Sequence, residues 1–444
     1  MAEKNVQNDF SKGNIPAVVM RMALPLIAAQ LVNVLYNVVD RIYIGHIPNV
    51  GSMALTGVGI ALPVISILSA FAGLFGQGGA PLCSMARGRG DNDEASRVMG
   101  NAFSMLLVSS VALGLLTWAF LDPVITVFAA GKEASSYARE YLAVYLIGTT
   151  FSFVSLGMNV YINAQGFATR GMLTVLLGAA ANIVLDPLFI FAFRMGVRGA
   201  AAATVLSQAL SAAWCFLFLR SSKTPLELSW RTMAPRKKIM GRIMSLGVAD
   251  FVMGATNSAI QTVANRQLGL YGGDLYVGAI TVVNSLRTIF TEIIHGFGSG
   301  IQPVLAFNYG AGQKKRVLET IRFSTLGAAA FSLLVWAVFM LFPEPLIRIF
   351  TPDEELSNIL SFVRTETSSP LSFSTLALNV SRPDNILPDT LPVLSITGTY
   401  ISEVHSQYRL FFFINCQIES VSLCESILLL LILSISKLIF LRNW

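Results

Sequence analysis

The chain has 444 residues, of which 54% are hydrophobic and only 13% are charged, and its mean hydropathy is +0.64. A soluble domain of this composition would expose more apolar surface than its core could bury, so the composition excludes an ordinary soluble protein and favours one embedded in a bilayer. The formal net charge of +6 comes from basic residues beside apolar segments, without the interleaved aromatic residues typical of nucleic-acid sites. We expect membrane lipids as partners and no nucleic acid.

The first residues are polar and include Lys12, and no short apolar segment with a small-residue cleavage site follows them. We therefore expect no removable signal peptide and a cytoplasmic N-terminus. Nine apolar segments follow, each with about 20 residues or more, which is the length needed to cross a bilayer as a helix. They lie near residues 22–45, 54–80, 98–121, 138–162, 170–193, 199–219, 241–265, 275–301 and 319–343.

Basic residues gather in alternate connections, after the second, sixth and eighth segments. Examples are Arg87, Arg89, Arg97, Arg220, Lys223, Arg236, Lys237, Lys238, Lys314, Lys315 and Arg316. Because cytoplasmic loops carry the excess of Lys and Arg, the pattern predicts a cytoplasmic connection at 220–242. The chain is thus expected to be a multi-pass protein of a cell membrane.

Two stretches of the chain match each other without a gap, 222 residues apart. Residues 75–81 with Gly88 and Gly90 align with residues 297–303 with Gly310 and Gly312. Duplicated helical halves are typical of transporters that bind a solute between them. The fold class predicted is all-α, with two lobes related by a repeat. The predicted divisions are a six-helix lobe at 1–220, a cytoplasmic connection at 221–240, the first three helices of a second lobe at 241–358 and an atypical tail at 359–444.

Two acidic residues interrupt the apolar pattern of the first half, Asp40 and Asp186. An ionisable group at membrane depth costs about 2.5–3.5 kcal/mol on insertion scales, so it usually faces a cavity and has a function. Asn182 stands four residues before Asp186, on the same face of a helix. Pro187 cannot donate to the carbonyl of Ile183, which stays free to accept from water or to bind a cation. These groups predict a proton or hard-cation site. The alternative is that Asp40 and Asp186 merely end their helices at the membrane surface.

Weaker candidates for polar residues of a cavity are Asn37, Glu292 and His295, which could equally make contacts between helices. The repeated glycines are assigned to packing and hinging, because no strand precedes Gly88 and Gly90 as a phosphate-binding loop requires. The sequence shows no nucleophile with a base, metal-ligand cluster or cofactor loop, so we expect neither an enzyme nor a cofactor.

Several short motifs together resemble the multidrug and toxic compound extrusion (MATE) family of bacterial transporters, over about residues 15–358. They are Met22-Ala23-Leu24-Pro25, residues 35–40, Ile162-Asn163-Ala164-Gln165-Gly166, residues 182–187, residues 199–204 with Ser207-Gln208, Gln302-Pro303, and Asn308-Tyr309-Gly310-Ala311.

The resemblance implies twelve helices in two six-helix lobes that form a V around a central cavity. It also implies export of organic cations and other amphipathic compounds, in exchange for protons or sodium, across the bacterial cell membrane. By the same resemblance, Asp40, Asn182, Asp186 and Thr204 handle the coupling ion, with sodium held only transiently at the first three, and Pro25 marks a bendable first helix.

The tail departs from this family pattern. After residue 360 the chain has one glycine, Gly398, one alanine, Ala377, and no methionine, whereas the whole chain has 35 glycines. We hypothesise that the tail was read out of frame or otherwise replaced, so that the second lobe is incomplete. Two alternatives to the antiporter stay open: a flippase for lipid-linked precursors from the same superfamily, and an inactive product of the aberrant tail.

Overall fold

The computed structural model describes residues 10–128 and 132–341, and within them it contains helices and no strand. The predicted tail at 359–444 and its hypothesised origin lie outside these residues. The first helices are α1 (Ile15–Gly45), α2 (Gly51–Gly88), α3 (Asn92–Ala119) and α4 (Leu121–Phe128). They are followed by α5 (Lys132–Tyr145), the 3₁₀ turn η1 (Leu146–Gly148), α6 (Thr149–Ala164), α7 (Ala168–Pro187), the π turn η2 (Leu188–Ala192) and α8 (Val197–Leu219). The last are α9 (Trp230–Met233), α10 (Lys237–Gly310) and α11 (Lys314–Leu341).

The all-helical class predicted from the sequence is confirmed for the described residues. Seven of their helical segments are long and apolar enough to cross a membrane. Apolar side chains on the outer face of α3 agree with this setting: Val108, Val111 and Leu115 recur every three or four residues and are exposed. In water such a stripe would be unfavourable, whereas in a bilayer it faces lipid.

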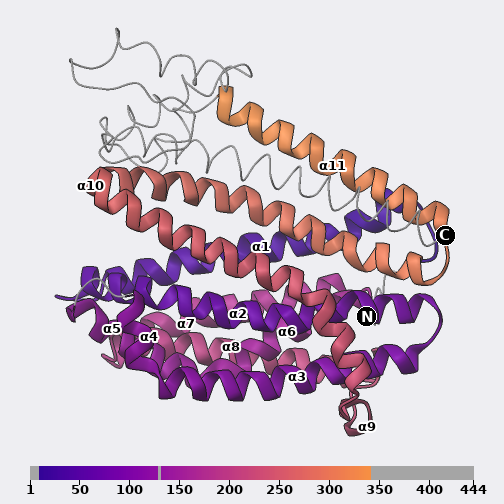
Figure 1. Ribbon diagram of the computed structural model, residues 1–444, viewed down its shortest axis with the longest axis horizontal. Helices are drawn as coiled ribbons and strands as arrows, with labels where there is room; N and C mark the ends of the chain where they lie inside the picture. The colour runs from indigo at the N-terminus through magenta and orange to yellow at the C-terminus, as the bar shows by residue number, and fades with distance from the viewer. Residues whose placement is uncertain (1–9, 129–131, 342–444) are drawn as a thin grey trace, which may run out of the picture. The chain divides into compact units, whose positions relative to one another are not determined.

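The predicted segments 241–265 and 275–301 both fall within α10, which is helical over 74 residues. Its two ends lie against α2: a Cβ added to Gly78 would meet the backbone of Gly247, and one added to Gly88 would meet that of Phe307. Those glycines are about 15 Å apart along α2, whereas a straight helix from residue 247 to 307 would extend about 90 Å. The element therefore folds back on itself, as Figure 1 shows.

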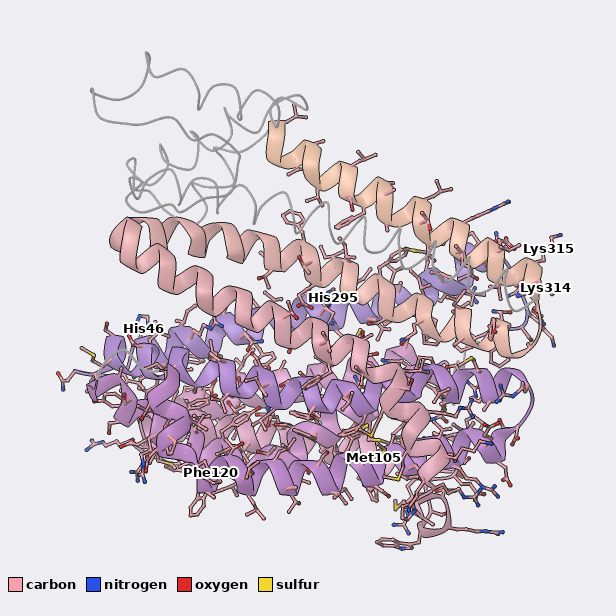
Figure 2. All side chains as sticks on the ribbon, in the orientation of Figure 1. His46, Met105, Phe120, His295, Lys314 and Lys315 are labelled. Carbon is pink, nitrogen blue, oxygen red and sulfur yellow. The ribbon has the colours of Figure 1, made fainter. Side chains whose placement is uncertain are left out.

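The chain divides into two compact units. The first comprises Met1–Ile260 and Thr291–Ser324; of the second, Gln261–Phe290 and Thr325–Leu341 are described. Within the first unit α2 packs against α3, α5 and α6, while α1 packs against α7 and α7 against α8. Figure 2 places His46 and Phe120 at one end of this unit and Lys314 and Lys315 at the other. The connection that carries Lys314 and Lys315 therefore lies at the opposite end from the 45–51 connection, in agreement with the predicted alternation of basic residues.

Small residues let the helices of the first unit approach closely. A Cβ on Gly76 would lie 2.9 Å from the Gly157 Cα, so α2 and α6 touch backbone to backbone. In a bilayer the lipid tails are as apolar as the side chains, so the hydrophobic effect does not drive helices together. Close packing is then a principal source of helix association. The hydroxyl of Tyr161 reinforces the contact by donating to the Phe75 carbonyl at 3.1 Å.

The repeat in the sequence is also a repeat in conformation. Gly90 and Gly312 both adopt positive φ, +80° and +69°, in the short turns that follow α2 and α10. Only glycine takes this conformation without strain, which explains why both copies carry it. Gly90 and Gly312 therefore serve turns, while the predicted hinging role of the repeated glycines stays a prediction.

Candidate functional site

Asp40 and Asp186 form the centre of the candidate site. Asp40 lies in the second half of α1 and Asp186 near the end of α7, and these two helices pack together. The two side chains lie close enough for each carboxyl group to affect the ionisation of the other. Two carboxylates this close repel each other, so the pair favours a proton or a cation that lowers its charge. The structure thus brings together two acids that stand 146 residues apart in the sequence.

Asn182 completes the group on the same face of α7. Its Nδ2 donates to Asp186 Oδ1 at 3.1 Å, and both side chains are buried, with exposed fractions of 2% and 0%. The predicted pairing of residues 182 and 186 on one helix face is therefore observed. Asp186 stands one residue before the end of α7, as the helix-end alternative requires, but its side chain is buried and not solvated.

Three oxygen atoms of this group accept no hydrogen bond from the described part of the chain. They are Asp40 Oδ1, Asp186 Oδ2 and Asn182 Oδ1. A buried acceptor without a donor costs about 1–3 kcal/mol, so the site favours whatever supplies positive charge. A proton or a hard cation that prefers oxygen ligands fits this donor set. In residues 10–128 and 132–341 no three His, Cys, Asp or Glu side chains converge, so a cation here would rest on two carboxyls and an amide.

Thr204 lies on α8 beside this group rather than within it. Its hydroxyl donates to the Ala200 carbonyl at 3.0 Å and lies beside the hydroxyl of Tyr141 on α5. A second link between α8 and its neighbours runs from Gln208 through Ser152 to the Tyr145 hydroxyl. Thr204 is therefore part of a buried polar layer that joins α5 to α8.

Sequence reasoning missed the tyrosines of the site. Tyr36 and Tyr141 both lie close enough to Asp40 for their ionisation to be affected by its charge. A signal was present, because Tyr36 stands four residues before Asp40 on the same face of α1. For Tyr141 the sequence offered no such signal, since its position depends on how α5 packs against α8.

The end of α7 has an irregular backbone next to the acids. Pro187 closes α7 and cannot donate to the Ile183 carbonyl, as predicted, and the π turn η2 follows at once. Such turns occur often at functional sites. The ring of Phe191 in η2 contacts Tyr43 of α1 edge to face, with centroids 6.4 Å apart, so the irregular turn is held against the helix that carries Asp40.

The other predicted polar residues stand elsewhere. Asn37 is exposed, and its Nδ2 donates to the Asn33 carbonyl of its own helix at 2.6 Å. Glu292 and His295 lie on α10, where Figure 2 labels His295, and His295 acts electrostatically on Glu292 and on Asp250. Pro25 lies inside α1, which continues through it from Ile15 to Gly45. Roles for these residues stay predictions.

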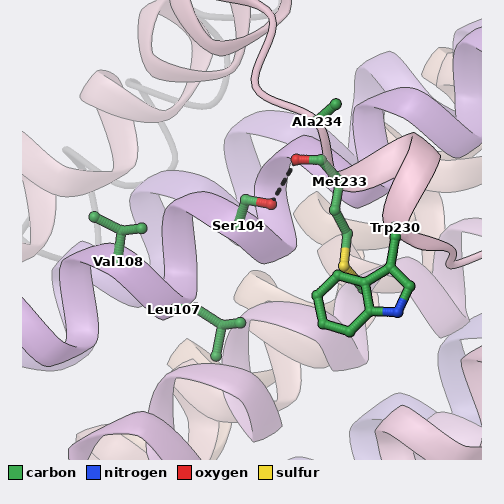
Figure 3. A pocket seen from close by; sticks show the side chains of 6 residues that line it. All are labelled: Ser104, Leu107, Val108, Trp230, Met233 and Ala234. Carbon is green, nitrogen blue, oxygen red and sulfur yellow. Dashed lines mark hydrogen bonds between the residues drawn. The ribbon is translucent and has the colours of Figure 1, made fainter.

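A surface cavity of about 300 Å³ lies between α3 and α9, on elements other than those of the acids. Figure 3 shows its lining, in which Ser104 Oγ donates to the Met233 carbonyl at 2.8 Å beside the exposed indole of Trp230. Leu107 and Val108 line it from α3. The cavity is mainly apolar and has no titratable group, so it is distinct from the candidate ion site.

Several membrane-spanning helices around a buried acidic pair define the class of the protein, a multi-pass membrane transporter. The MatE family model matches residues 25–188 and 251–380, about two thirds of the sequence, and the chain belongs to this family, whose members are transporters and not enzymes. The second match runs some 20 residues past the predicted start of the tail at 359 and then ends.

Relatives agree with this membership. The chain is 25% identical over 363 residues to the multidrug export protein MepA of Staphylococcus haemolyticus. The aligned region covers 82% of this chain and 79% of the relative. A solved multidrug resistance MATE transporter in an outward-facing conformation matches with a TM-score of 0.74 and 25% identity, over 82% of this chain and 81% of that one. A transporter from Pyrococcus furiosus, described as having a binding pocket of reversed polarity and a different function, matches with the same TM-score and identity, over 82% and 80% of the chains.

Proposed function

We propose that the chain specifies a cation-coupled antiporter, which exports organic cations or other amphipathic compounds while protons or sodium ions move inward across the bacterial plasma membrane. The observation that carries this proposal is the proximity of the Asp40 and Asp186 carboxyl groups, each of which has one buried oxygen without a hydrogen-bond donor in the described residues. Two adjacent carboxyls cannot both ionise without strong repulsion, so the pair binds a proton or a cation in one state and releases it in another.

The packing of the pair suggests how ion binding acts on the solute. Asp40 belongs to α1 and Asp186 to α7, so neutralising the pair favours contact between these helices and ionising it favours their separation. An ion can drive transport only if it binds two conformations with different affinity, and a charge-dependent contact between helices provides that difference. Asn182 and the Ile183 carbonyl, to which Pro187 cannot donate, supply further oxygens on the α7 side.

The relatives support multidrug export as the direction and substrate class, since MepA is described as a multidrug export protein. The fold does not decide the substrate, because a similar structure is described as having a pocket of reversed polarity and a different function. For this chain the buried acids favour a cationic solute over the anionic headgroup that a lipid-linked precursor flippase would bind.

The test is dye efflux from inverted membrane vesicles of a bacterial host that lacks its own multidrug pumps. The chain is compared with a version in which residues after 358 are replaced by the matching segment of a twelve-helix relative. We expect the completed version to move a cationic dye when a proton or sodium gradient is imposed, and not without one. Dye movement that ignores both gradients would contradict the proposal, and movement of lipid-linked precursors without dye movement would favour the flippase.

A further inference from the structure

Arg316, in the first turn of α11, binds the segment that precedes α1. Its guanidinium donates to the carbonyls of Gly13 at 2.8 Å, Phe10 at 2.9 Å and Lys12 at 3.3 Å. Its Nε donates to Asn308 Oδ1 at 3.0 Å. Arginine presents five donors in a rigid planar fork, so one side chain gathers three carbonyls and an amide in a way that lysine cannot.

An apolar layer lies beneath these hydrogen bonds. Phe10 is 1% exposed and meets Phe307 of α10 edge to face, with ring centroids 5.6 Å apart. Val304, which is fully buried, belongs to the same cluster as Phe10 and several apolar residues of α1. Asn308 is also fully buried and donates to the Val304 carbonyl at 2.8 Å, which fixes the amide that orients Arg316.

These contacts join the two repeats. The segment at 10–13 leads into α1 of the first repeat, whereas Arg316, Asn308 and Phe307 belong to the second. The repeat mate of Arg316, 222 residues earlier, is Glu94, which forms a solvent-accessible ion pair with Arg242 at 3.2 Å. Glu94 and Arg316 thus each bind a residue of the other repeat. Only Arg316 binds backbone carbonyls, and these lie above the buried pair of Phe10 and Phe307.

A transporter that binds its solute between two repeats must separate them on each side in turn. We propose that Arg316 and Phe10 fasten the repeats together at the end that carries the 310–314 connection, and that transport requires their release. Arg316 is a positioning residue in this account, since it acts on the arrangement of the helices and not on solute or ion. The inference rests on the transport function proposed above.

The experiment measures how accessible the contact between the two repeats is to a water-soluble reagent, and it does not depend on transport activity. In the version whose residues after 358 come from a twelve-helix relative, any cysteine after residue 358 is changed to serine and a reporter is introduced by Val304→Cys, which places a thiol under Arg316. Membranes made permeable to a water-soluble maleimide are labelled, and the rate at each cysteine is read by mass spectrometry. Cys83 and Cys215, both buried among helices of the first repeat, report any general loosening of the fold.

We expect Arg316→Gln to raise the labelling rate at position 304 by about tenfold. This corresponds to a loss of ~1.4 kcal/mol in the free energy that favours contact between the two repeats over their separation. Phe10→Ala should act in the same direction, and Arg316→Lys should give a smaller rise because it keeps the charge without the fork. Lys315→Gln is the matched control, since this exposed neighbour in Figure 2 loses one positive charge without touching the segment at 10–13.

Equal rates at position 304 in Arg316→Gln and in the parent would overturn the proposal. So would a parallel rise at Cys83 and Cys215, because Arg316 would then stabilise the fold in general. A failure of dye efflux alone would count against the proposed function but would leave this measurement intact.

Discussion

Gly88 and Gly310 are repeat mates, and each packs against the backbone next to the other. A Cβ on Gly88 would overlap the Phe307 carbonyl oxygen, and a Cβ on Gly310 would overlap that of Met85. The ends of α2 and α10 therefore touch at two symmetric points, backbone to backbone. No side chain fits between them in this arrangement.

A methyl group at either glycine should push these helix ends apart. We expect Gly310→Ala to destabilise the protein by about 1–3 kcal/mol, as overpacking of a close contact does, and to lower its midpoint of thermal unfolding. Gly298→Ala is the control on the same helix, because a Cβ there would meet nothing within 4 Å. If both variants unfold at the same temperature, the contact between the helix ends is looser than described.

The acidic pair predicts a loss of ion coupling when either carboxyl is neutralised permanently. In the version with a completed second repeat, Asp40→Asn and Asp186→Asn should each reduce gradient-driven dye efflux to the level of vesicles without the protein. An amide cannot take up and release a proton, and it binds a cation more weakly than a carboxylate. Asp122→Asn is the control, since Asp122 makes an exposed ion pair with Arg139 outside the site. Wild-type efflux by both site variants would remove the pair from the mechanism.

Thr204 offers a finer test, since its hydroxyl lies beside the hydroxyl of the buried Tyr141. Thr204→Val keeps the shape but removes the polar group next to the buried tyrosine hydroxyl, at a cost of about 1–3 kcal/mol. We expect this variant to be less stable to heat and slower in efflux, whereas Thr204→Ser should resemble the parent. Equal behaviour of the valine and serine variants would show that the hydroxyl contributes nothing to the polar layer.

The sequence predicted the spans and the acids because both depend on local chemistry. Apolar length alone marks a membrane helix, and the cost of a buried charge marks Asp40 and Asp186 as unusual wherever their helices pack. The four-residue spacing then placed Asn182 beside Asp186 before any tertiary contact was known. The repeat likewise predicted close packing at the glycines, and the structure confirms it at Gly88 and Gly310.

Tyr141 and Arg316 could not be predicted in the same way. Tyr141 reaches Thr204 only because α5 packs against α8, and apolar periodicity does not specify that pairing. Arg316 binds backbone carbonyls, which every residue has, so no sequence pattern marks its partners at 10–13. Phe10 lies among polar residues near the N-terminus, and these neighbours suggested that it would be exposed to solvent. In the structure its ring is buried.

The orientation of the chain gives a prediction that a single labelling experiment checks. The basic connection that includes Arg231 should be cytoplasmic, whereas Ser52, at the opposite end of α2 from Gly88, should face outside. A cysteine at position 231 should react with an impermeant reagent only in inverted vesicles, and one at position 52 only in intact cells. Both positions are exposed, so a lack of reaction would reflect sidedness and not burial. The reverse pattern would invert the topology.

The tail predicts the fate of the chain as written. If the second lobe has only its first three helices, polar helix faces are open to lipid, where each unsatisfied group costs several kcal/mol. Residues 359–444 are rich in serine and interrupted by Pro383, Pro388 and Pro392, so they lack the periodic apolar segments that would cover those faces. We therefore expect the chain to insert its first six spans, to be cleared by proteases and to confer no drug resistance, while the completed version confers it. Resequencing the coding region across codons 355–365 should reveal a shift of frame. An unbroken frame together with full drug resistance from the chain as written would show that the tail completes the transporter in a way that its composition does not indicate.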